Sequence, residues 1–469
     1  MKFNRFIPVI TSTMLLASCS FNPLSPTTSS SSGSSSSTTT STTSSTGSSS
    51  SHSTGTSTTS SSSSTPIGDK AAWTILVYMC GSNLESGWSE DYHEYEHNEF
   101  LASGDIAEML SVNGQPSDVN IVIQTGGSKR WKPTSSGGYG ISNSKIGRYH
   151  IRNRQLIKDA ELSQASMADQ STLEGFLSYG LTNYPAEKTG VIFWDHGGGM
   201  FGVCNDENYD NDALYNDEVQ GAFKNVLGSK KLEFVGYDAC LMAIQDVAET
   251  NSKYFNYMVC SQESESGYGW DYDTWIDDLY AKKTTPNILK AIVDGFIASM
   301  GGVNASGEYY EGEYYPADQT LSYLDLTKMS SYKTAWENLA TALKTKVGSS
   351  YSTFRSNVMA KVKYFAGTDY DYFSEYDVSH FLDKLSSSSF NPGGTYISDV
   401  RTALSDLVAY NLAQKEAAHD ANGLSLFFPS SSSYLSYQKS VYTTDDTNLS
   451  NWRSFALAAG GNVNSTYSY

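Results

Sequence analysis

The sequence predicts an α/β fold in which a mostly parallel central sheet is flanked by helices on both faces. Two observations lead to this prediction. Short apolar runs rich in β-branched and aromatic residues recur along the chain, as expected for strands that are buried on both faces. Segments with a helical spacing of apolar residues alternate with these runs. The predicted strands lie at Trp73–Met79, Val119–Gln124, Val191–Trp194, Phe234–Tyr237 and Phe255–Cys260.

The helices between the predicted strands have identifiable starts. A short amphipathic helix is expected around Asp105–Leu110. The next helix is expected to begin at Ser171, which forms a capping box with Glu174. Asn216 is expected to cap a further helix, whose first turn is acidic. This order of strand, helix, strand and helix is the pattern that gives parallel strand pairing.

The second part of the chain is more helical. Its predicted elements are helices at 288–300, 336–347 and 397–412 and strands at 321–326 and 424–428. We therefore expect a folded core at residues 67–285. Residues 286–469 are expected to form a C-terminal region that packs on this core or completes it.

The first 66 residues are not expected to belong to the folded core. Residues 1–19 resemble an export signal, with a positively charged start and an apolar run at residues 6–16. The run ends in Leu16-Ala17-Ser18-Cys19, which resembles a bacterial lipobox and implies a lipid anchor on the Cys19 sulfur. Residues 20–66 are almost all Ser and Thr and predict a disordered tether. The expected location is that of an exported bacterial lipoprotein at the cell envelope or surface, attached to the membrane by its lipid.

Composition restricts the partners further. The net charge is −19 and no cluster of Lys and Arg occurs, so we do not expect a nucleic acid partner. Besides Cys19 the chain has Cys80, Cys204, Cys240 and Cys260, too few for a disulfide scaffold in an exported protein. Cys80, Cys204 and Cys260 could supply at most one bridge, and the sequence does not select its pair.

Two of the predicted strands end in the same way. The segments VIFWDHGGG (191–199) and FVGYDACLM (234–242) each pass from an apolar run through an Asp to a reactive side chain, His196 or Cys240. Open α/β sheets present functional groups at the carboxyl ends of their strands. A Cys with a His elsewhere in the chain is typical of a nucleophile and its base.

The residues around this pair suit acyl transfer. A thiol is only slightly ionised at neutral pH, and His196 would take its proton and later protonate the leaving amine. Gly197 can turn its N–H toward a developing oxyanion, and the N–H of Cys240 would be the second donor. This chemistry requires no cofactor.

Four blocks, in the order WTILVYMCGSNLE, VIFWDHGGG, FVGYDACLM and SQESESGYGWDYD, resemble the clostripain family of cysteine peptidases, which shares the caspase and gingipain fold. Weaker similarity occurs at residues 376–381 and 423–429. The resemblance implies a caspase-like sheet, peptide or protein substrates and a thioacyl-enzyme formed by His196 and Cys240. It also implies cleavage after basic residues, with Asp238 near the base of the pocket for the residue before the scissile bond.

The last block departs from the family pattern. The aspartate that reads a basic side chain in the family falls on Tyr268, two residues before Trp270. A phenol cannot pair with Arg as a carboxylate does. Asp238, Asp271 or Asp273 could compensate, so we expect Asp238, Tyr268 and Trp270 to contact substrate while the preference for Arg or Lys stays open.

A calcium site is a second expectation. Asp206, Asn208, Asp210, Asp212 and Asp217 fall at offsets that resemble a calcium loop. Asn211 stands where such a loop has its turn glycine, and capping of the following helix explains part of the pattern.

Two alternatives to a thiol peptidase follow from other segments. His93-Glu94-Tyr95-Glu96-His97 has the spacing of a zinc hydrolase, although its flanks lack an apolar helix face. A non-catalytic binding lipoprotein with a peptidase-like fold is the other alternative, because 33 Tyr residues and clusters such as Tyr309-Tyr310 and Tyr314-Tyr315 could bind a partner.

Overall fold

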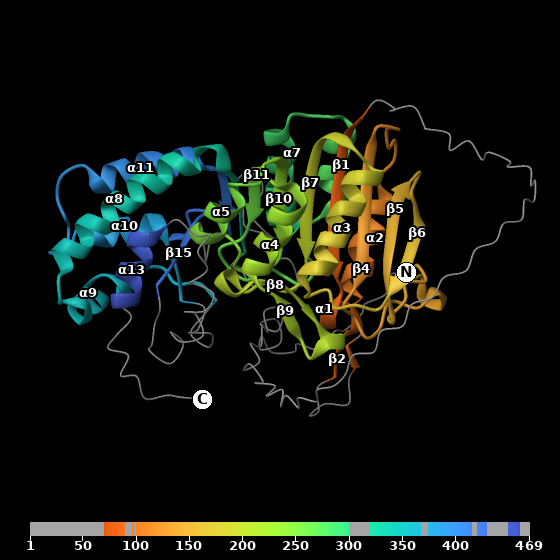
Figure 1. Ribbon diagram of the computed structural model, residues 1–469, viewed down its shortest axis with the longest axis horizontal. Coiled ribbons are helices and arrows are strands. Elements are labelled where there is room, and N and C mark those ends of the chain that lie inside the picture. The colour runs from red at the N-terminus through yellow and green to blue at the C-terminus, as the bar shows by residue number, and fades with distance from the viewer. Residues whose placement is uncertain are drawn as a thin grey trace, which may run out of the picture.

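The computed structural model describes residues 70–89, 96–97, 100–299, 319–366, 374–414, 420–428 and 449–459. The predicted signal, Cys19, the tether and His93 lie outside these residues. The predicted α/β fold is confirmed, because a nine-stranded sheet forms the centre of the molecule (Figure 1). From edge to edge its strands are β14 (Val408–Ala413), β12 (Thr320–Asp325), β11 (Phe255–Cys260), β10 (Leu232–Asp238), β7 (Ala186–Trp194), β1 (Ala71–Cys80), β4 (Val119–Gly126), β5 (Lys145–Arg152) and β6 (Gln155–Ser163).

The five central strands, β11, β10, β7, β1 and β4, are parallel. Antiparallel strands extend the sheet on both sides, β5 and β6 beyond β4 and β12 and β14 beyond β11. In β1 every residue from Trp73 to Cys80 is buried, which explains its uninterrupted apolar sequence. Alternate side chains serve opposite cores, with Leu76 and Tyr78 on one face and Ile75 and Val77 on the other.

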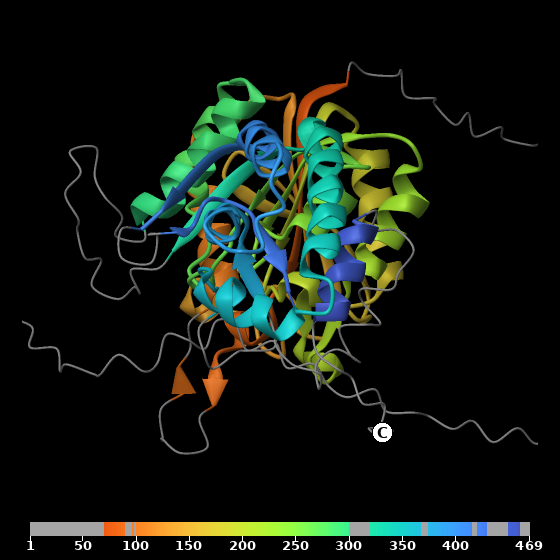
Figure 2. The ribbon, with the colours of Figure 1, turned by 90° about the vertical axis from the view of Figure 1, so that its left-hand side faces the viewer.

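Helices cover both faces of the sheet. In Figure 2, α7 lies on one side, and α3 and α4 lie on the other. The first face also carries α2 and α6, whose apolar side chains share one core with Ile75 and Val77. The covering helices are α2 (Leu101–Ser111), α3 (Gln170–Asn183), α4 (Asn216–Leu227), α5 (Gln245–Asn251), α6 (Tyr272–Tyr280) and α7 (Thr285–Ser299).

The C-terminal region contributes β12 and β14 to the sheet and adds a group of helices beside β14, at the left of Figure 1. The centre of this helical group contains Trp336, Phe381 and Trp452, which pack together. The ring centroids of the two indoles are 4.8 Å apart. This core is continuous with the core beneath α3 and α4. The helices are α8 (Met329–Val347), α9 (Tyr351–Asn357), α10 (Val378–Ser386), α11 (Tyr396–Leu407) and α13 (Ser450–Ala459).

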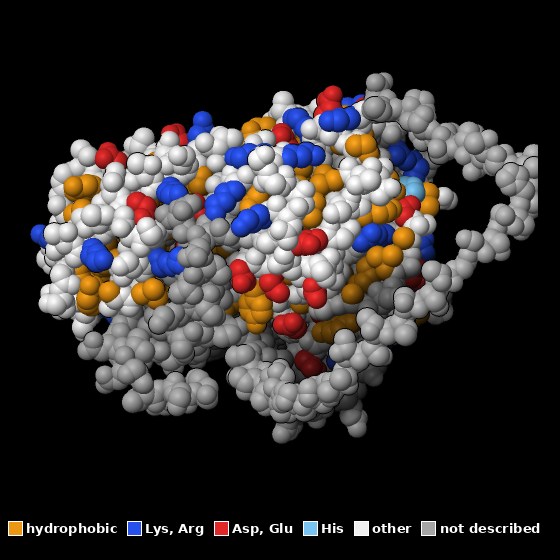
Figure 3. Space-filling model, viewed as in Figure 1, with side chains coloured by type: hydrophobic (Ala, Val, Ile, Leu, Met, Phe, Trp, Pro, Cys, Tyr) orange, Lys and Arg blue, Asp and Glu red, His pale blue; other side chains and the backbone are white. Residues whose placement is uncertain are grey.

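Short elements lie at the ends of the central strands. They are α1 (Ser82–Ser86) and the strand pairs β2 (Trp88–Ser89) with β3 (Glu96–His97), β8 (Val203–Asp206) with β9 (Asp212–Leu214), and β13 (Glu375–Asp377) with β15 (Ser425–Phe427). Figure 3 shows acidic side chains gathered over α4 and the β8–β9 pair, where Asp210, Asp212 and Asp217 are exposed. Among the described helices, none combines the length and hydropathy that crossing a bilayer requires.

Several local predictions were wrong. The helix predicted at 397–412 ends at Leu407, and the residues after it form β14. Asp169, not Ser171, caps α3 by accepting a hydrogen bond from the backbone of Ser171. Asn216 does not cap α4: it is the first residue of that helix, and its side chain donates to the carbonyl of Gly199.

Candidate active site

His196 and Cys240 follow neighbouring parallel strands in register. Trp194, the last residue of β7, pairs with Asp238, the last residue of β10. Each reactive residue therefore lies two positions beyond a paired strand end, at the same edge of the sheet. β1 flanks β7 on its other side, and the order of connection reverses between these two strands. Such a reversal at the carboxyl edge is where open α/β sheets bind ligands.

Asn83, which the sequence analysis did not single out, determines the state of the histidine ring. His196 is buried, and its Nε2 lies 2.7 Å from Oδ1 of Asn83 on α1. An amide oxygen can only accept, so Nε2 carries the hydrogen. In the neutral ring, Nδ1 is then the nitrogen that can accept a proton.

Asp195 fixes the backbone that carries His196. Its buried carboxylate accepts hydrogen bonds from Ser82 Oγ at 2.5 Å and from the backbone N–H of Asn205 at 2.6 Å. The carbonyl of His196 accepts from the N–H of Cys204 at 3.0 Å. Burial raises the pKa of Asp195 well above its usual range. The start of α1, the end of β7 and strand β8 are thus joined around the histidine.

Gly197 places the histidine turn directly against the main chain of Cys240. A Cβ at this position would lie 2.1 Å from the carbonyl oxygen of Cys240 and 2.9 Å from its nitrogen. No side chain fits there, so glycine is required by close approach. The structure brings together His196, Gly197 and Cys240, the residues that the sequence predicted for one site.

The backbone around Cys240 is strained and tightly held. Its Sγ accepts a hydrogen bond from the N–H of Glu265 at 3.2 Å. The next residue, Leu241, is buried with φ of +66°, a region that branched side chains seldom adopt. Such strain concentrates at functional sites, where the surrounding structure enforces it. No helix starts at Cys240 itself, and α5 begins only at Gln245.

A pocket opens beside Cys240, with an empty volume of about 260 Å³ that includes solvent at its mouth. Asp238 lines it. Tyr268 is half exposed and is not among the lining residues, and Trp270 is buried behind the pocket, where its N–H donates to Asp238. The lining residues are Leu84, Trp194, Asp195, Asp238, Ala239, Cys240, Glu265, Ser266, Gly267 and Gly269.

Three buried carboxyl groups gather at this pocket: Asp238 and Glu265 line it, and Asp105 lies next to them. Burial raises the pKa of Asp238 to about 7 and those of Asp105 and Glu265 well above their usual range. The sequence analysis missed Asp105 and Glu265. Asp105 was detectable, because it occupies the apolar face of α2 one turn from Ala102 and Met109, both buried.

Cys240 lines the pocket, whereas Cys80, Cys204 and Cys260 are not among its lining residues. Cys80, Cys204 and Cys260 are fully buried free thiols. Burial raises the pKa of all three. A thiol that resists ionisation is a poor nucleophile.

The predicted metal-binding residues have other contacts. The carboxylate of Asp206 accepts from the backbone of Met167 and Asn208. Within the described ranges, no group of three or more His, Cys, Asp or Glu side chains is placed to hold a metal ion. His97 lies in the short strand β3, not on a helix.

Comparison with known proteins agrees with this geometry. The sequence model of the clostripain family, Peptidase_C11, matches residues 77–458. Clostripain from Hathewaya histolytica is 25% identical over 336 residues, which make up 62% of this chain and 62% of that protein. The chain therefore matches less than two thirds of the length of this relative.

Two solved structures share the fold. A secreted C11 cysteine protease from Bacteroides thetaiotaomicron, in complex with an irreversible peptide inhibitor, has a TM-score of 0.57 at 15% identity, covering 82% of this chain and 100% of that one. An inactive zymogen C11 protease from Parabacteroides distasonis has a TM-score of 0.56 at 15% identity, covering 81% and 97%. The likeness agrees with the predicted caspase-like sheet.

Proposed function

Because the chain belongs to the clostripain family, we propose that it is a cysteine endopeptidase that cleaves peptide bonds with His196 and Cys240. The observation that carries this proposal is the register of β7 and β10, which places both residues two positions beyond paired strand ends. The contact of Gly197 with the main chain of Cys240 supports it further.

The chemistry proceeds in two stages. His196 Nδ1 takes the thiol proton, and the Sγ of Cys240 attacks the carbonyl carbon of the peptide bond. The N–H groups of Gly197 and Cys240 stabilise the oxyanion, each contributing about 3 kcal/mol. The tetrahedral intermediate collapses to a thioester as the C–N bond breaks, and the amine leaves with the proton from His196. A water molecule, deprotonated by His196, then hydrolyses the thioester and restores the thiol.

Asp238 supports a preference for a basic residue before the scissile bond. Its carboxylate lines the pocket beside Cys240 and is held by Tyr272 Oη at 2.9 Å and by the N–H of Trp270 at 3.1 Å. A buried carboxylate that lines a pocket pairs strongly with Lys or Arg. Protein or peptide segments that contain basic residues are therefore the proposed substrates.

The site is also proposed to act outside the cell and without a cofactor. The lipobox at Leu16–Cys19 supports export and a lipid anchor. The steps above use only side chains and backbone groups of this chain. Calcium binding at Asp206, Asn208, Asp210 and Asp217 stays a prediction, which activity measured with and without a chelator tests.

Replacing the nucleophile tests the proposed function. We expect Cys240→Ala to abolish hydrolysis of a mixed peptide library, because no other group forms the thioester. Cys260→Ala is the matched control, since Cys260 is a buried free thiol at the end of the adjacent strand β11. This control is expected to keep activity within a few fold. Hydrolysis that persists in folded Cys240→Ala, checked by circular dichroism, would contradict the proposal.

A further inference from the structure

The pocket beside Cys240 lacks a carboxylate at the position where the family pattern has its second one. Tyr268 stands there, with half of its surface exposed, and it does not line the pocket. The two acids that follow it do not replace the missing group. Asp271 and Asp273 belong to the start of α6, Asp273 is exposed, and neither lines the pocket.

Asp105 reaches the same place from a different element. It lies on α2, yet its carboxylate accepts a hydrogen bond from the indole N–H of Trp194, a lining residue, at 2.5 Å. Gly269 and Asp238 both line the pocket, and Asp105 lies directly behind them without lining it. A Cβ on Gly269 would lie 3.0 Å from Asp105 Oδ2 and 3.0 Å from Asp238 Oδ1, so these oxygens are no more than 6.0 Å apart.

This spacing suits a shared cation. An ammonium or guanidinium group hydrogen-bonds carboxylate oxygens at about 2.8 Å, so one such group between two carboxylates spans roughly 5.6 Å. Gly269, with φ of +64° and no side chain, keeps the space between the two carboxylates free of a Cβ.

The groups that face the two carboxylates are acidic or neutral. Asp105 is flanked by Glu108 on its own helix and Glu85 on α1. Asp238 is flanked by Glu265 and by the Tyr272 hydroxyl from α6. Among the ion pairs of the described residues, none joins Asp105 or Asp238 to Lys or Arg. A basic side chain from a substrate would supply the missing positive charge.

We propose that Asp105 is a specificity residue of this pocket, which together with Asp238 recognises a Lys or Arg side chain and takes the place of the carboxylate absent at Tyr268. This inference rests on the proposed peptidase function. It assigns recognition of the basic side chain to a residue that lies 91 positions before His196 in the chain.

The arrangement makes recognition depend on pH. Burial raises the pKa of both carboxyls, that of Asp238 to about 7, so below neutral pH the empty pocket is largely protonated. The pocket gains negative charge as the pH rises through this value. KM for a substrate with Arg before the scissile bond should therefore fall between pH 6 and 8, whereas KM for the same peptide with neutral citrulline should not.

Asp105→Asn tests the proposal, because an amide oxygen can still accept from Trp194 while the charge is lost. We expect kcat/KM for the Arg peptide to fall about tenfold or more, mainly through KM, and kcat/KM for the citrulline peptide to change little. Asp273→Asn is the matched control, since it removes an exposed acid close in sequence to the pocket, and it should leave both values unchanged.

Every other outcome of these measurements would overturn the proposal. Equal losses on both peptides would mean that Asp105 is only structural. An unchanged Arg preference would assign recognition to Asp238 alone. If Asp105→Asn does not fold, the KM of the wild-type protein for the Arg peptide is measured between pH 6 and 8 instead. A KM that does not vary over this range overturns the proposal. A wild-type protein that cleaves only peptides without Arg would refute this inference but not the peptidase function, and one that cleaves nothing would refute both.

Discussion

Asn83 determines which nitrogen of His196 is available as a base. The hydrogen bond from Nε2 to its amide oxygen, 2.7 Å long, keeps the hydrogen on Nε2 and holds the ring in one orientation. Asn83 does not touch the reacting atoms in the proposed mechanism, so it is a positioning residue. A hydrogen bond to a group that becomes charged contributes about 1.5–3 kcal/mol, which corresponds to roughly one to two orders of magnitude in rate.

Replacing Asn83 should therefore change kcat and not KM. We expect Asn83→Ala to lower kcat by about 10- to 100-fold. In Asn83→Asp the anionic acceptor would stabilise the imidazolium form, so the acidic limb of the kcat/KM profile should move to higher pH. Ser86→Ala, on the same short helix, is the control and should retain wild-type kinetics. Wild-type kcat in Asn83→Ala together with an unshifted profile in Asn83→Asp would refute this role.

Some site residues could be predicted from sequence because they follow apolar strands directly. His196, Gly197, Asp238 and Cys240 are of this kind, since a parallel sheet necessarily aligns its strand ends. Asn83 could not be assigned a role, because the direction of its side chain depends on the turn at Ser82, which has φ of +43°. Asp105 approaches the pocket from a helix, and only the packing of α2 on the sheet brings it there.

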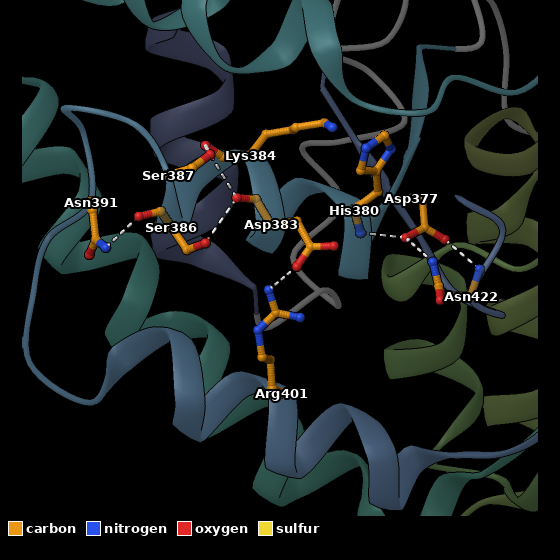
Figure 4. A network of polar contacts seen from close by, with 9 residues as sticks. All are labelled: Asp377, His380, Asp383, Lys384, Ser386, Ser387, Asn391, Arg401 and Asn422. Atoms are coloured by element: carbon orange, nitrogen blue, oxygen red, sulfur yellow. Dashed lines mark hydrogen bonds and ion pairs between the residues drawn. The ribbon is translucent and has the colours of Figure 1, made fainter. Parts of the chain in front are cut away.

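At the scale of elements, β13 and β15 fasten the C-terminal region to the end of β11. Asp377 accepts hydrogen bonds from the backbone N–H of His380 and from the backbone and side chain of Asn422 (Figure 4). It also accepts from Gln262, which follows β11, at 3.0 Å. The N–H of Ser425 in β15 donates to the carbonyl of Ala243, three residues after Cys240. This pair of strands therefore supports the backbone that carries the proposed nucleophile.

Asp377→Ala should loosen this connection. Two buried donors, the N–H of His380 and the side-chain amide of Gln262, would lose their acceptor at a cost of about 1–3 kcal/mol each, so we expect a loss of at least 2 kcal/mol in the free energy of unfolding. Activity should fall as well, because Ala243 is no longer held in place. The measurement is denaturant unfolding combined with kcat/KM.

Asp383→Ala is the matched control for Asp377→Ala. Asp383 lies on α10, the helix that Asp377 caps, and pairs with Arg401 at the surface (Figure 4). An exposed pair contributes little, so this variant should lose no more than about 1 kcal/mol. Equal stability of the two variants would show that Asp377 does not fasten the C-terminal region.

The elements missed from sequence lack a distinctive pattern. Residues 408–413 continue the helical spacing of α11, and only pairing with β12, more than 80 residues earlier, makes them a strand. Strand β6 has no buried residue, so it carries no apolar run, and β5 alternates without the continuous burial of the central strands. Strands such as β1 were predicted because both of their faces are buried.

At the scale of the whole molecule, the amino ends and the carboxyl ends of the parallel strands lie on opposite sides of the sheet. β1 starts at Ala71 at the top of Figure 1, whereas the β8–β9 pair lies at the bottom with the carboxyl ends of the strands. The ten residues of β1 span about 33 Å. The segment before Ala71, which includes the predicted lipid anchor, is therefore attached at the edge opposite to His196 and Cys240.

Removing the anchor should change location and not chemistry. We expect Cys19→Ser to move the protein from the membrane fraction to the soluble fraction, because the thioether cannot form, with kcat/KM unchanged. Ser20→Ala, the adjacent substitution, should remain with the membrane. Cys19→Ser that stays membrane-bound would contradict lipidation at Cys19.

The attachment point and the active site lie at opposite ends of the sheet, and this placement affects how substrates reach the pocket. The predicted tether of residues 20–66 would leave the orientation of the folded part free, but it joins the sheet at the end away from the pocket, so the attachment point itself does not cover the pocket. The acidic surface over the β8–β9 pair lies at the end of the sheet that carries His196 and Cys240, where it favours the approach of cationic polypeptides.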